Sequence, residues 1–408
     1  MARMELLSPA GGMEQLEAAL RFGADAVYGG LKRFGLRASA GNFDWDELER
    51  ALRLTHEKGA RFYVTLNVLP YDDELEALAE SAEKAFKMGV DAAIVSDPGA
   101  VALLRRRVPG LPVHVSTQAN VMNSETAAIF TALGVKRIVV SRELSLERVR
   151  RLKEKLPEGV EVEAFVHGAM CMAHSGRCMM SDHIMGRGGN RGACAQPCRW
   201  EYIVTEVKRP NEPMPVLENE EGTYIFSAYD LNMLSHLPEM REAGIISLKI
   251  EGRMKTAYYV ASVTRIYREA LDLLEKDEDA YRAALPRLEE ELLKVSHRAS
   301  NTGFYFGRPQ PSSGADGFHQ TMEFSGKVLG CENGMIAVEV RNRFEKGDVL
   351  EAVTPHGVIP IPVEKMIRED GTETDFVSIA GSRVLVAGDA PVEKGDYLRG
   401  INRNHLRK

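Results

Sequence analysis

Short apolar, β-branched runs alternate with longer helix-patterned stretches through the first 250 or so residues of this 408-residue chain. Eight such runs, most with a helical pattern after them, fit a (β/α)8 barrel, in which parallel strands alternate with outer helices. A doubly wound open sheet is the alternative, but no Gly-x-Gly-x-x-Gly turn follows the first run. The predicted strands are 5–8, 24–28, 61–69, 92–96, 113–118, 137–141, 160–167 and 246–251.

Apolar residues at helical spacing predict the helices of the barrel. Ser145 stands before one of them as a plausible N-cap, because its hydroxyl can accept a hydrogen bond from the first helical turn. The predicted helices include 12–22, 45–58, 74–88, 146–155, a closing helix at 257–274 and a charged helix at 280–293.

The chain divides into a large α/β part and a small all-β part. We expect a TIM-like barrel over residues 1–300, with a Cys-rich loop and a hairpin (201–207 with 224–227) inserted at about 168–228. A linker rich in Gly, Pro and Ser follows at 301–318. Short alternating strands with Asn-Gly and Asp-Gly turns then predict a C-terminal all-β barrel domain over 319–408.

Polar side chains stand at the ends of several predicted strands, where barrels of this kind carry their chemistry. Strand alternation places Glu163, Phe165 and His167 on one face, which leaves His167 near the mouth of the barrel. Lys249 and Glu251 share a face by the same period. These groups either satisfy one another inside the barrel or form a polar pocket, and their coincidence at the same ends favours the pocket. Ser8, Asn67, Ser96, Gln118 and Ser141 end other strands.

Four of the five cysteines, Cys171, Cys178, Cys194 and Cys198, lie within 28 residues, whereas Cys331 stands alone in the β domain. A structural zinc site usually shows two tight Cys-x2–4-Cys pairs, and a gap of six residues fits that pattern poorly. An iron–sulfur cluster also takes four thiolates and tolerates irregular spacing. Four buried thiols without a metal are the third possibility.

The formal net charge of −7 gives no global attraction to nucleic acid or to an anionic membrane. Residues 171–200 nevertheless carry four arginines against one acid, so this loop either attracts an anionic substrate or RNA phosphate, or is simply solvated. The N-terminus has no signal-peptide pattern, and no apolar run approaches the length of a membrane span. We therefore expect a cytoplasmic protein with reduced thiols.

Several motifs together carry a resemblance to a known family. The run Glu163-Ala-Phe-Val-His-Gly-Ala-Met-Cys171-x4-Gly-Arg-Cys178-Met-Met-Ser181 is similar to the signature of the peptidase U32 (collagenase-like protease) family. The supporting motifs are 7–11, 37–43, 194–199, 226–231 and 249–253, and the similarity spans essentially the whole chain. Within the family, the chain most resembles the proteins of tRNA 5-hydroxyuridine synthesis.

The family name implies peptide hydrolysis, but neither His-Glu-x-x-His nor Gly-x-Ser-x-Gly occurs in the sequence. The resemblance to the tRNA-modifying members instead implies an iron–sulfur protein. It implies oxygen-independent, prephenate-dependent hydroxylation of the wobble uridine of tRNA. Cys171, Cys178, Cys194 and Cys198 match the cluster-binding positions, with a 4Fe-4S cluster expected and zinc as the alternative.

The arginines of the expected site suit a small dicarboxylate or a phosphate in charge and geometry; they are Arg37, Arg177, Arg199 and Arg253. The candidates for donor binding and proton transfer are Glu163, His167, Lys249 and Glu251. Two alternative functions stay open: a peptidase with a zinc or cysteine site, and a non-catalytic tRNA-binding scaffold. The sequence does not indicate the oligomeric state.

Overall fold

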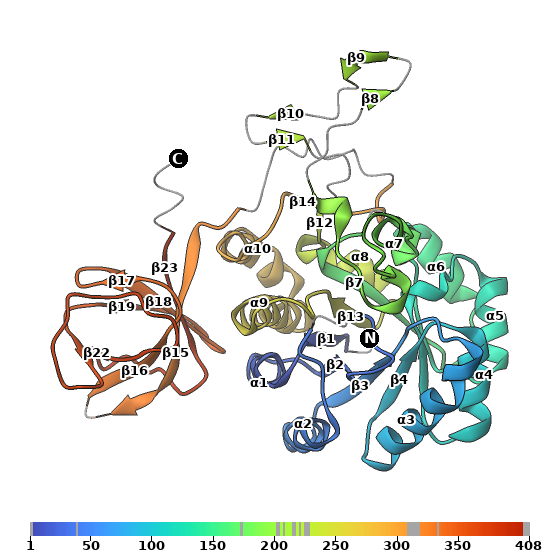
Figure 1. The fold of residues 1–408 in the computed structure, drawn as a ribbon, viewed down its shortest axis with the longest axis horizontal. Helices are drawn as coiled ribbons and strands as arrows, with labels where there is room; N and C mark the ends of the chain where they lie inside the picture. The colour runs from blue at the N-terminus through green and yellow to red at the C-terminus, as the bar shows by residue number, and fades with distance from the viewer. Residues whose placement is uncertain are drawn as a thin grey trace.

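Eight parallel strands close a barrel in the computed structural model, as the alternating pattern predicts (Figure 1). Strands pair in chain order from β1 to β7, and β13 pairs with both β7 and β1, which closes the ring and excludes the open sheet. The strands are β1 (Glu5–Ala10), β2 (Ala26–Gly30), β3 (Arg61–Leu66), β4 (Ala92–Val95), β5 (Val113–Val115), β6 (Arg137–Val139), β7 (Glu161–Ala169) and β13 (Ser247–Ile250). The structure describes residues 3–37, 40–171, 174–200, 205–206, 209–213, 218–219, 222–223, 229–307, 319–332 and 334–402.

Helices cover the outside of the barrel (Figure 1). They include α1 (Met13–Arg21), α2 (Trp45–Glu57), α3 (Leu75–Lys87), α4 (Pro98–Arg107), α5 (Ser124–Ala132), α6 (Leu146–Glu154), α8 (Leu237–Glu242), α9 (Ala257–Lys276) and α10 (Glu278–Leu293). Ser145 caps α6 as predicted, because its side chain accepts from the N–H of Arg148. Across the described residues, no helix combines the length and the apolar character needed to cross a membrane.

The barrel interior holds a chain of buried charged side chains. Arg137 Nη1 donates to Glu5 Oε1 at 2.5 Å and to Glu163 Oε2 at 3.2 Å, and Lys249 Nζ donates to Glu163 Oε1 at 2.9 Å. Burial raises the pKa of Glu5, but Arg137, Arg61 and Tyr63 together outweigh that effect and hold the pKa below its ordinary value. Buried charges persist only when they are paired in this way. This series of ion pairs therefore connects Glu5, at the N-terminal end of β1, to Lys249 near the mouth of the barrel.

Strand β7 continues beyond the barrel and directs the chain into the insertion. Its last residues pair antiparallel with β12 (Asp230–Asn232), so that Ala169 stands opposite Asp230, and β14 (Ser300–Asn301) pairs with β12 on the far side. Gly168 has φ +102°, and a Cβ there would lie 2.6 Å from the carbonyl oxygen of Glu251. Only glycine fits this crossing without strain.

The insertion leaves and re-enters the fold at these paired positions. It contains η3 (His174–Gly176), α7 (Met180–Met185), η4 (Gly189–Arg191), η5 (Pro197–Arg199) and the short strands β8 (Thr205–Glu206), β9 (Arg209–Pro213), β10 (Glu218–Asn219) and β11 (Gly222–Thr223). Most of the predicted hairpin, 201–207 with 224–227, lies outside the described residues. In the described residues β8 pairs with β9 and not with the predicted segment 224–227. β9 is much nearer in the sequence, because only residues 207–208 separate it from β8.

The C-terminal part is an antiparallel all-β domain with its own apolar core. Its main sheet has the order β19-β18-β23-β15-β16-β22-β20, and β17 pairs with β21. The strands are β15 (Met322–Glu332), β16 (Met335–Val340), β17 (Phe344–Glu345), β18 (Val349–Thr354), β19 (Gly357–Pro362), β20 (Met366–Arg368), β21 (Phe376–Val377), β22 (Arg383–Ala387) and β23 (Tyr397–Ile401).

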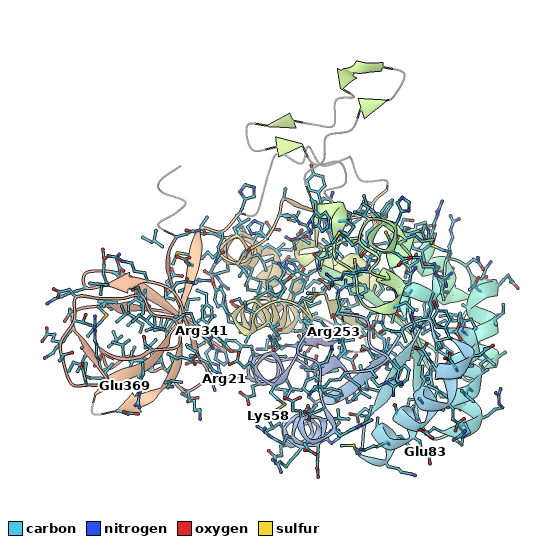
Figure 2. All side chains as sticks on the ribbon, viewed as in Figure 1. Arg21, Lys58, Glu83, Arg253, Arg341 and Glu369 are labelled. Atoms are coloured by element: carbon cyan, nitrogen blue, oxygen red, sulfur yellow. The ribbon has the colours of Figure 1, made fainter. Side chains whose placement is uncertain are left out.

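The β domain packs against α1, α9 and α10 through buried ions and aromatic rings. Arg399 is fully buried, and its Nη2 donates to Glu291 Oε2 of α10 at 2.8 Å. Arg21 of α1 donates to Asp396 at 2.7 Å, and Figure 2 shows Arg21 and Arg341 at this boundary. Tyr258 of α9 stacks on Phe324, with 5.0 Å between ring centroids. These contacts fix the β domain on the side of the barrel away from α3 to α6 (Figure 1).

Candidate functional site

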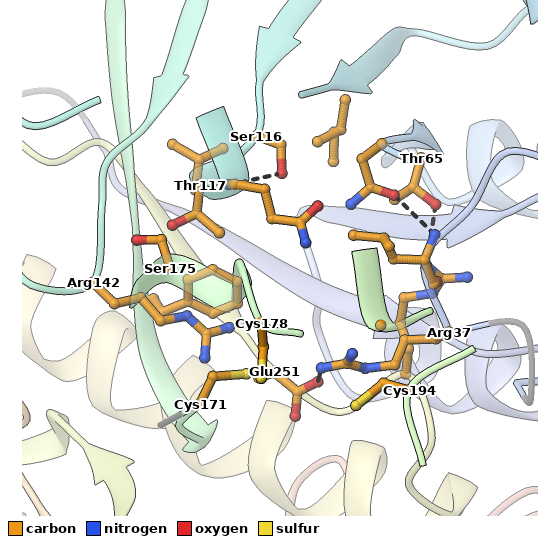
Figure 3. A pocket seen from close by; sticks show the side chains of 18 of the residues that line it. Arg37, Thr65, Ser116, Thr117, Arg142, Cys171, Ser175, Cys178, Cys194 and Glu251 are labelled. Carbon is orange, nitrogen blue, oxygen red and sulfur yellow. Dashed lines mark hydrogen bonds and ion pairs between the residues drawn. The ribbon is translucent and has the colours of Figure 1, made fainter. Parts of the chain in front are cut away.

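A cavity of about 330 Å³ lies at the end of the barrel where the parallel strands terminate (Figure 3). One part of its wall comes from residues 171–200, which we call the cysteine segment. The barrel contributes the rest of the wall through strand ends and the loops that follow them; these residues include Tyr28, Thr65, Asn67, Ile94, Ser116, Gln118, Val139, Phe165, Lys249 and Glu251. The position agrees with the rule that such barrels carry their sites at the C-terminal ends of the strands.

The polar residues predicted at the strand ends divide between the cavity and the structure around it. Asn67 and Gln118 line the cavity. Ser96 donates to the carbonyl oxygen of Asn67, whereas Ser8 shares a hydrogen bond with Thr264 of α9. The prediction of a polar pocket is therefore confirmed for some of these residues, and the others support its walls.

All four clustered cysteines line this cavity, half-buried, although they come from different turns of the cysteine segment. The N–H of Met180 donates to Cys178 Sγ, and the N–H of Gln196 donates to Cys194 Sγ, both at 3.3 Å. Backbone N–H groups directed at sulfur stabilise thiolates and tune the clusters that thiolates hold. Figure 3 shows Cys171, Cys178 and Cys194 on the same side of the cavity.

The donor set suits an iron–sulfur cluster in its chemistry, because four thiols and two N–H to sulfur contacts face one cavity. A mononuclear zinc ion instead needs its ligands within about 2.0–2.3 Å of one point. Among the residues that the structure describes, no three His, Cys, Asp or Glu side chains are arranged closely enough to hold a metal ion. The argument for an iron–sulfur cluster therefore rests on the presence of four thiols and on their position around one cavity.

Arg191 and Glu143 make two of the polar contacts that hold the cysteine segment over the barrel. Arg191 Nη2 donates to Glu74 Oε1 at 2.6 Å, and Arg191 Nη1 donates to Glu74 Oε2 at 2.7 Å and to the carbonyl oxygen of Leu69 at 2.9 Å. The hydrogen bond from Arg191 is the main reason that the pKa of Glu74 falls to about 2. This two-point ion pair connects η4 to the loop between β3 and α3.

The second contact centres on Glu143, which follows β6. Its carboxylate accepts from the N–H and the hydroxyl of Ser175, each at 2.5 Å, and from the hydroxyl of Ser141. Burial raises the pKa of Glu143, but the hydrogen bonds from the two serines bring it below its ordinary value. Ser175 has φ +43°, a left-handed conformation that these hydrogen bonds hold in place.

Lys249 stands at the floor of the cavity. Its Nζ lies 4.3 Å from the ring centroid of Tyr28 and 2.9 Å from Glu163 Oε1. Burial lowers the pKa of Lys249, and the facing carboxylate offsets only part of that effect. Burial raises the pKa of Glu163, but Lys249 and Arg137 together hold it below its ordinary value. Glu163 therefore serves Lys249 from below the cavity rather than lining it.

Arg37, Arg253 and Glu251 also line the cavity. Arg253 Nη1 donates to the carbonyl oxygen of Leu36 at 2.6 Å, and Nη2 donates to Asn42. Burial lowers the pKa of Arg253 to about 10. Arg37 Nη2 lies 3.7 Å from Glu251 Oε1, so this pair keeps its charges facing the cavity.

The structure places His167 away from the cavity, although strand alternation predicted it near the mouth. Lys249 pairs with Phe165 but Ile250 pairs with His167, so a β-bulge interrupts the alternation between these two pairs. His167 is buried, its ring centroid lies 5.5 Å from that of Tyr267 on α9, and burial lowers its pKa to about 4. The physical reason for the difference is the extra residue of the bulge.

The other two predicted arginines do not complete the cavity wall in the described structure. Arg177 is exposed and is not among the residues that line the cavity; its Nε donates to the carbonyl oxygen of Gln118 at 2.9 Å. The side chain of Arg199 lies outside the described part of the chain.

Arg142 lines the cavity and was not predicted. It follows β6, and its guanidinium carbon lies 3.8 Å from the ring centroid of Phe165. The signal was its position one residue after Ser141, at the end of a correctly predicted strand. Strand periodicity does not define side-chain directions beyond the end of a strand, so the pattern alone could not select it.

Comparison with known proteins identifies relatives over most of the chain. Residues 11–314 match peptidase family U32, and residues 320–399 match the peptidase family U32 C-terminal domain. The tRNA hydroxylation protein P of Escherichia coli is 35% identical over 418 residues, covering 91% of this chain and 90% of the relative. A collagenase of Porphyromonas gingivalis is 35% identical and covers 74% of each chain. The 23S rRNA 5-hydroxycytidine synthase of Escherichia coli is 33% identical, covering 88% of this chain and 53% of the relative.

Proposed function

The chain belongs to peptidase family U32, and from that premise we propose that it is an RNA-modifying enzyme that hydroxylates the wobble uridine of tRNA. In this proposal the reaction needs no molecular oxygen and uses an iron–sulfur cluster together with prephenate. The observation that carries it is the convergence of Cys171, Cys178, Cys194 and Cys198 on one cavity at the C-terminal end of the barrel.

RNA as the substrate is supported by the relatives. Two of them are named for hydroxylation of tRNA and of rRNA, and the first covers nine-tenths of both chains. An enzyme that modifies a base must reach its target atom outside the stacked helix, so the uridine would enter the cavity from the mouth. The wobble position suits this requirement, because it belongs to a single-stranded loop.

We assign the roles of this chain's residues as follows. Cys171, Cys178, Cys194 and Cys198 would hold the cluster, which supplies electron transfer or a binding site for the small oxygen-containing acid. Lys249 and Glu251 face the cavity, where they can bind the acid and hold a proton at Nζ and at the carboxylate. Glu163 keeps Lys249 in position through their 2.9 Å contact. His167, packed against α9, would act only by fixing the end of β7.

The first test is the metal content of the protein after anaerobic purification. We expect a brown protein with iron, sulfide and an absorption band near 400 nm, and we expect the Cys178→Ser variant to lose all three. Cys331→Ser is the matched control, because Cys331 is exposed in the β domain and should leave the iron content unchanged. A colourless protein that contains one zinc ion per chain would contradict the proposal.

The second test measures 5-hydroxyuridine in tRNA by mass spectrometry after deletion of the gene. The native gene should restore the modification, whereas Cys178→Ser should not. Restoration by Cys178→Ser would instead favour the scaffold alternative, in which the metal site only holds the loop. The peptidase alternative, which the collagenase relative keeps open, predicts cleavage of gelatin by purified protein free of other proteases; we expect none.

A further inference from the structure

Four cationic side chains line the cavity, and three of them already have partners within the protein. Lys249 contacts Glu163 at 2.9 Å, and Arg37 lies 3.7 Å from Glu251. Arg253 donates to Leu36, Thr65 and Asn42. The fourth cation, Arg142, differs from these three in its surroundings.

The guanidinium of Arg142 is held in place without a counterion in the described structure. Nη1 donates to the carbonyl oxygen of Ala169 at 3.0 Å, and the group stacks on Phe165 at 3.8 Å. Within the described residues, no carboxylate lies within 4.0 Å of its nitrogens, and Nε and Nη2 donate to no protein acceptor. A half-buried guanidinium fixed on two sides, with donors left over, is prepared to bind an anion.

We infer that Arg142 binds a carboxylate group of a small organic acid inside the cavity. The planar donor pair of a guanidinium matches a carboxylate in two-point geometry. The aromatic rings of Phe165 and Tyr28 lie beside the cationic groups and can contact the apolar part of such an acid. Among the residues that the structure describes, Glu251 is the one carboxylate that lines the cavity, so the charge balance there favours an anion.

A second carboxylate of the same acid has a partner across the cavity. Arg37 lies on the side opposite Arg142 in Figure 3. Its partner Glu251 lies at 3.7 Å, an ion pair without a hydrogen bond, so that a bound carboxylate can still accept from the Arg37 guanidinium. An acid with two carboxylates would therefore span the space between the two guanidinium groups. This inference rests on the proposed function in one respect, the choice of a dicarboxylate as the co-substrate.

Binding of the acid can be measured without any RNA. We would titrate the cluster-containing protein by calorimetry with prephenate, which has two carboxylates, and with phenylpyruvate, which has one. Arg142→Gln should weaken prephenate binding roughly 10- to 100-fold, because hydrogen bonds between charged groups are the strong ones. Arg142→Lys keeps the charge but loses the two-point geometry, so its affinity for prephenate should lie between those of the wild type and of Arg142→Gln. Wild-type protein should bind phenylpyruvate more weakly than prephenate.

Arg187→Gln is the control, since Arg187 is an exposed arginine of the same cysteine segment. It should bind prephenate like the wild type, and each variant should keep its cluster absorption and melting temperature. Equal affinity of Arg142→Gln and wild-type protein would overturn the inference, as would failure of wild-type protein to bind either acid. If Arg142→Gln instead bound a uridine oligonucleotide more weakly but prephenate as tightly as the wild type, Arg142 would be a contact for RNA and not for the acid.

Failure of the proposed function has a different signature: the acid would still bind through Arg142, but tRNA hydroxylation would not depend on the protein.

Discussion

Lys249 Nζ and Glu163 Oε1 lie 2.9 Å apart, and both residues are buried, although only Lys249 lines the cavity. Glu163 also accepts from Arg137 Nη1 at 3.2 Å, so one carboxylate contacts two buried cations. Removing it leaves both cations without that partner in a medium of low dielectric constant.

The first prediction concerns this carboxylate. Glu163→Gln should lower the free energy of unfolding by about 3–5 kcal/mol, because it breaks a buried ion network from one side. It should also lower the pKa of Lys249 further, since the charge that raises that pKa disappears. Urea unfolding at pH 7 measures the first effect. Glu161→Gln is the control: Glu161 binds the same Arg137 but is 39% exposed, and it should cost about 1 kcal/mol or less.

If Glu163→Gln and Glu161→Gln lowered the free energy of unfolding equally, burial would not determine how much these ion pairs stabilise the fold.

The second prediction concerns the pH dependence of stability. Burial lowers the pKa of His167 to about 4, below the ordinary 6.5, so between these values the unfolded chain binds a proton that the folded chain does not. Stability is therefore complete above pH 6.5 and falls as the pH decreases toward 4, by roughly 3 kcal/mol from this residue. His167→Asn should be less stable at pH 7 but should lose less stability on acidification.

Urea unfolding at several pH values between 7 and 4 gives this slope. A variant whose profile runs parallel to that of the wild type would show that His167 is protonated alike in both states.

The third prediction concerns the ion pair between Arg191 and Glu74. Arg191→Gln should raise amide hydrogen exchange in residues 186–200 on the order of fivefold, as a local loss of about 1 kcal/mol implies. The protein should also retain less iron after purification, since the cysteine segment loses one of its attachments to the barrel. Arg107→Gln removes a comparable contact with Glu76, 2.8 Å long, between α3 and α4, and should change neither quantity.

Unchanged exchange in Arg191→Gln would show that the remaining contacts, among them those of Ser175 with Glu143 and of Arg177 with Gln118, suffice to hold the segment.

The fourth prediction concerns the attachment of the β domain. Arg399→Gln leaves Glu291 and Glu351 without their buried guanidinium, and should cost about 3–5 kcal/mol. We expect the two domains to unfold in separate transitions during calorimetry, whereas the wild type unfolds in one. Arg383→Gln, which removes an exposed contact with Glu332 in the same domain, should retain the single transition. A single transition in both variants would mean that the aromatic contacts suffice.

The strands of the barrel could be predicted because burial on both faces requires continuous apolar runs, which are visible in one sequence. The cysteine cavity could be predicted in part for a similar reason, since local clustering already limits where the four thiols lie. Its closure could not be predicted: Arg191 and Glu74 are 117 residues apart, and nothing local pairs them. His167 was misplaced because a bulge depends on the neighbouring strand, and Arg142 was missed because its direction depends on Phe165.

The antiparallel pairing of Ala169 with Asp230 places the two ends of the long insertion side by side. Only the two paired ends of this insertion belong to the sheet, so the sheet makes the same contacts with it whatever its length. Lengthening a loop whose ends are already fixed costs little additional entropy. The part of the insertion after the cysteine segment could therefore change in length while that segment, the cavity it lines and the barrel beneath it stay as they are.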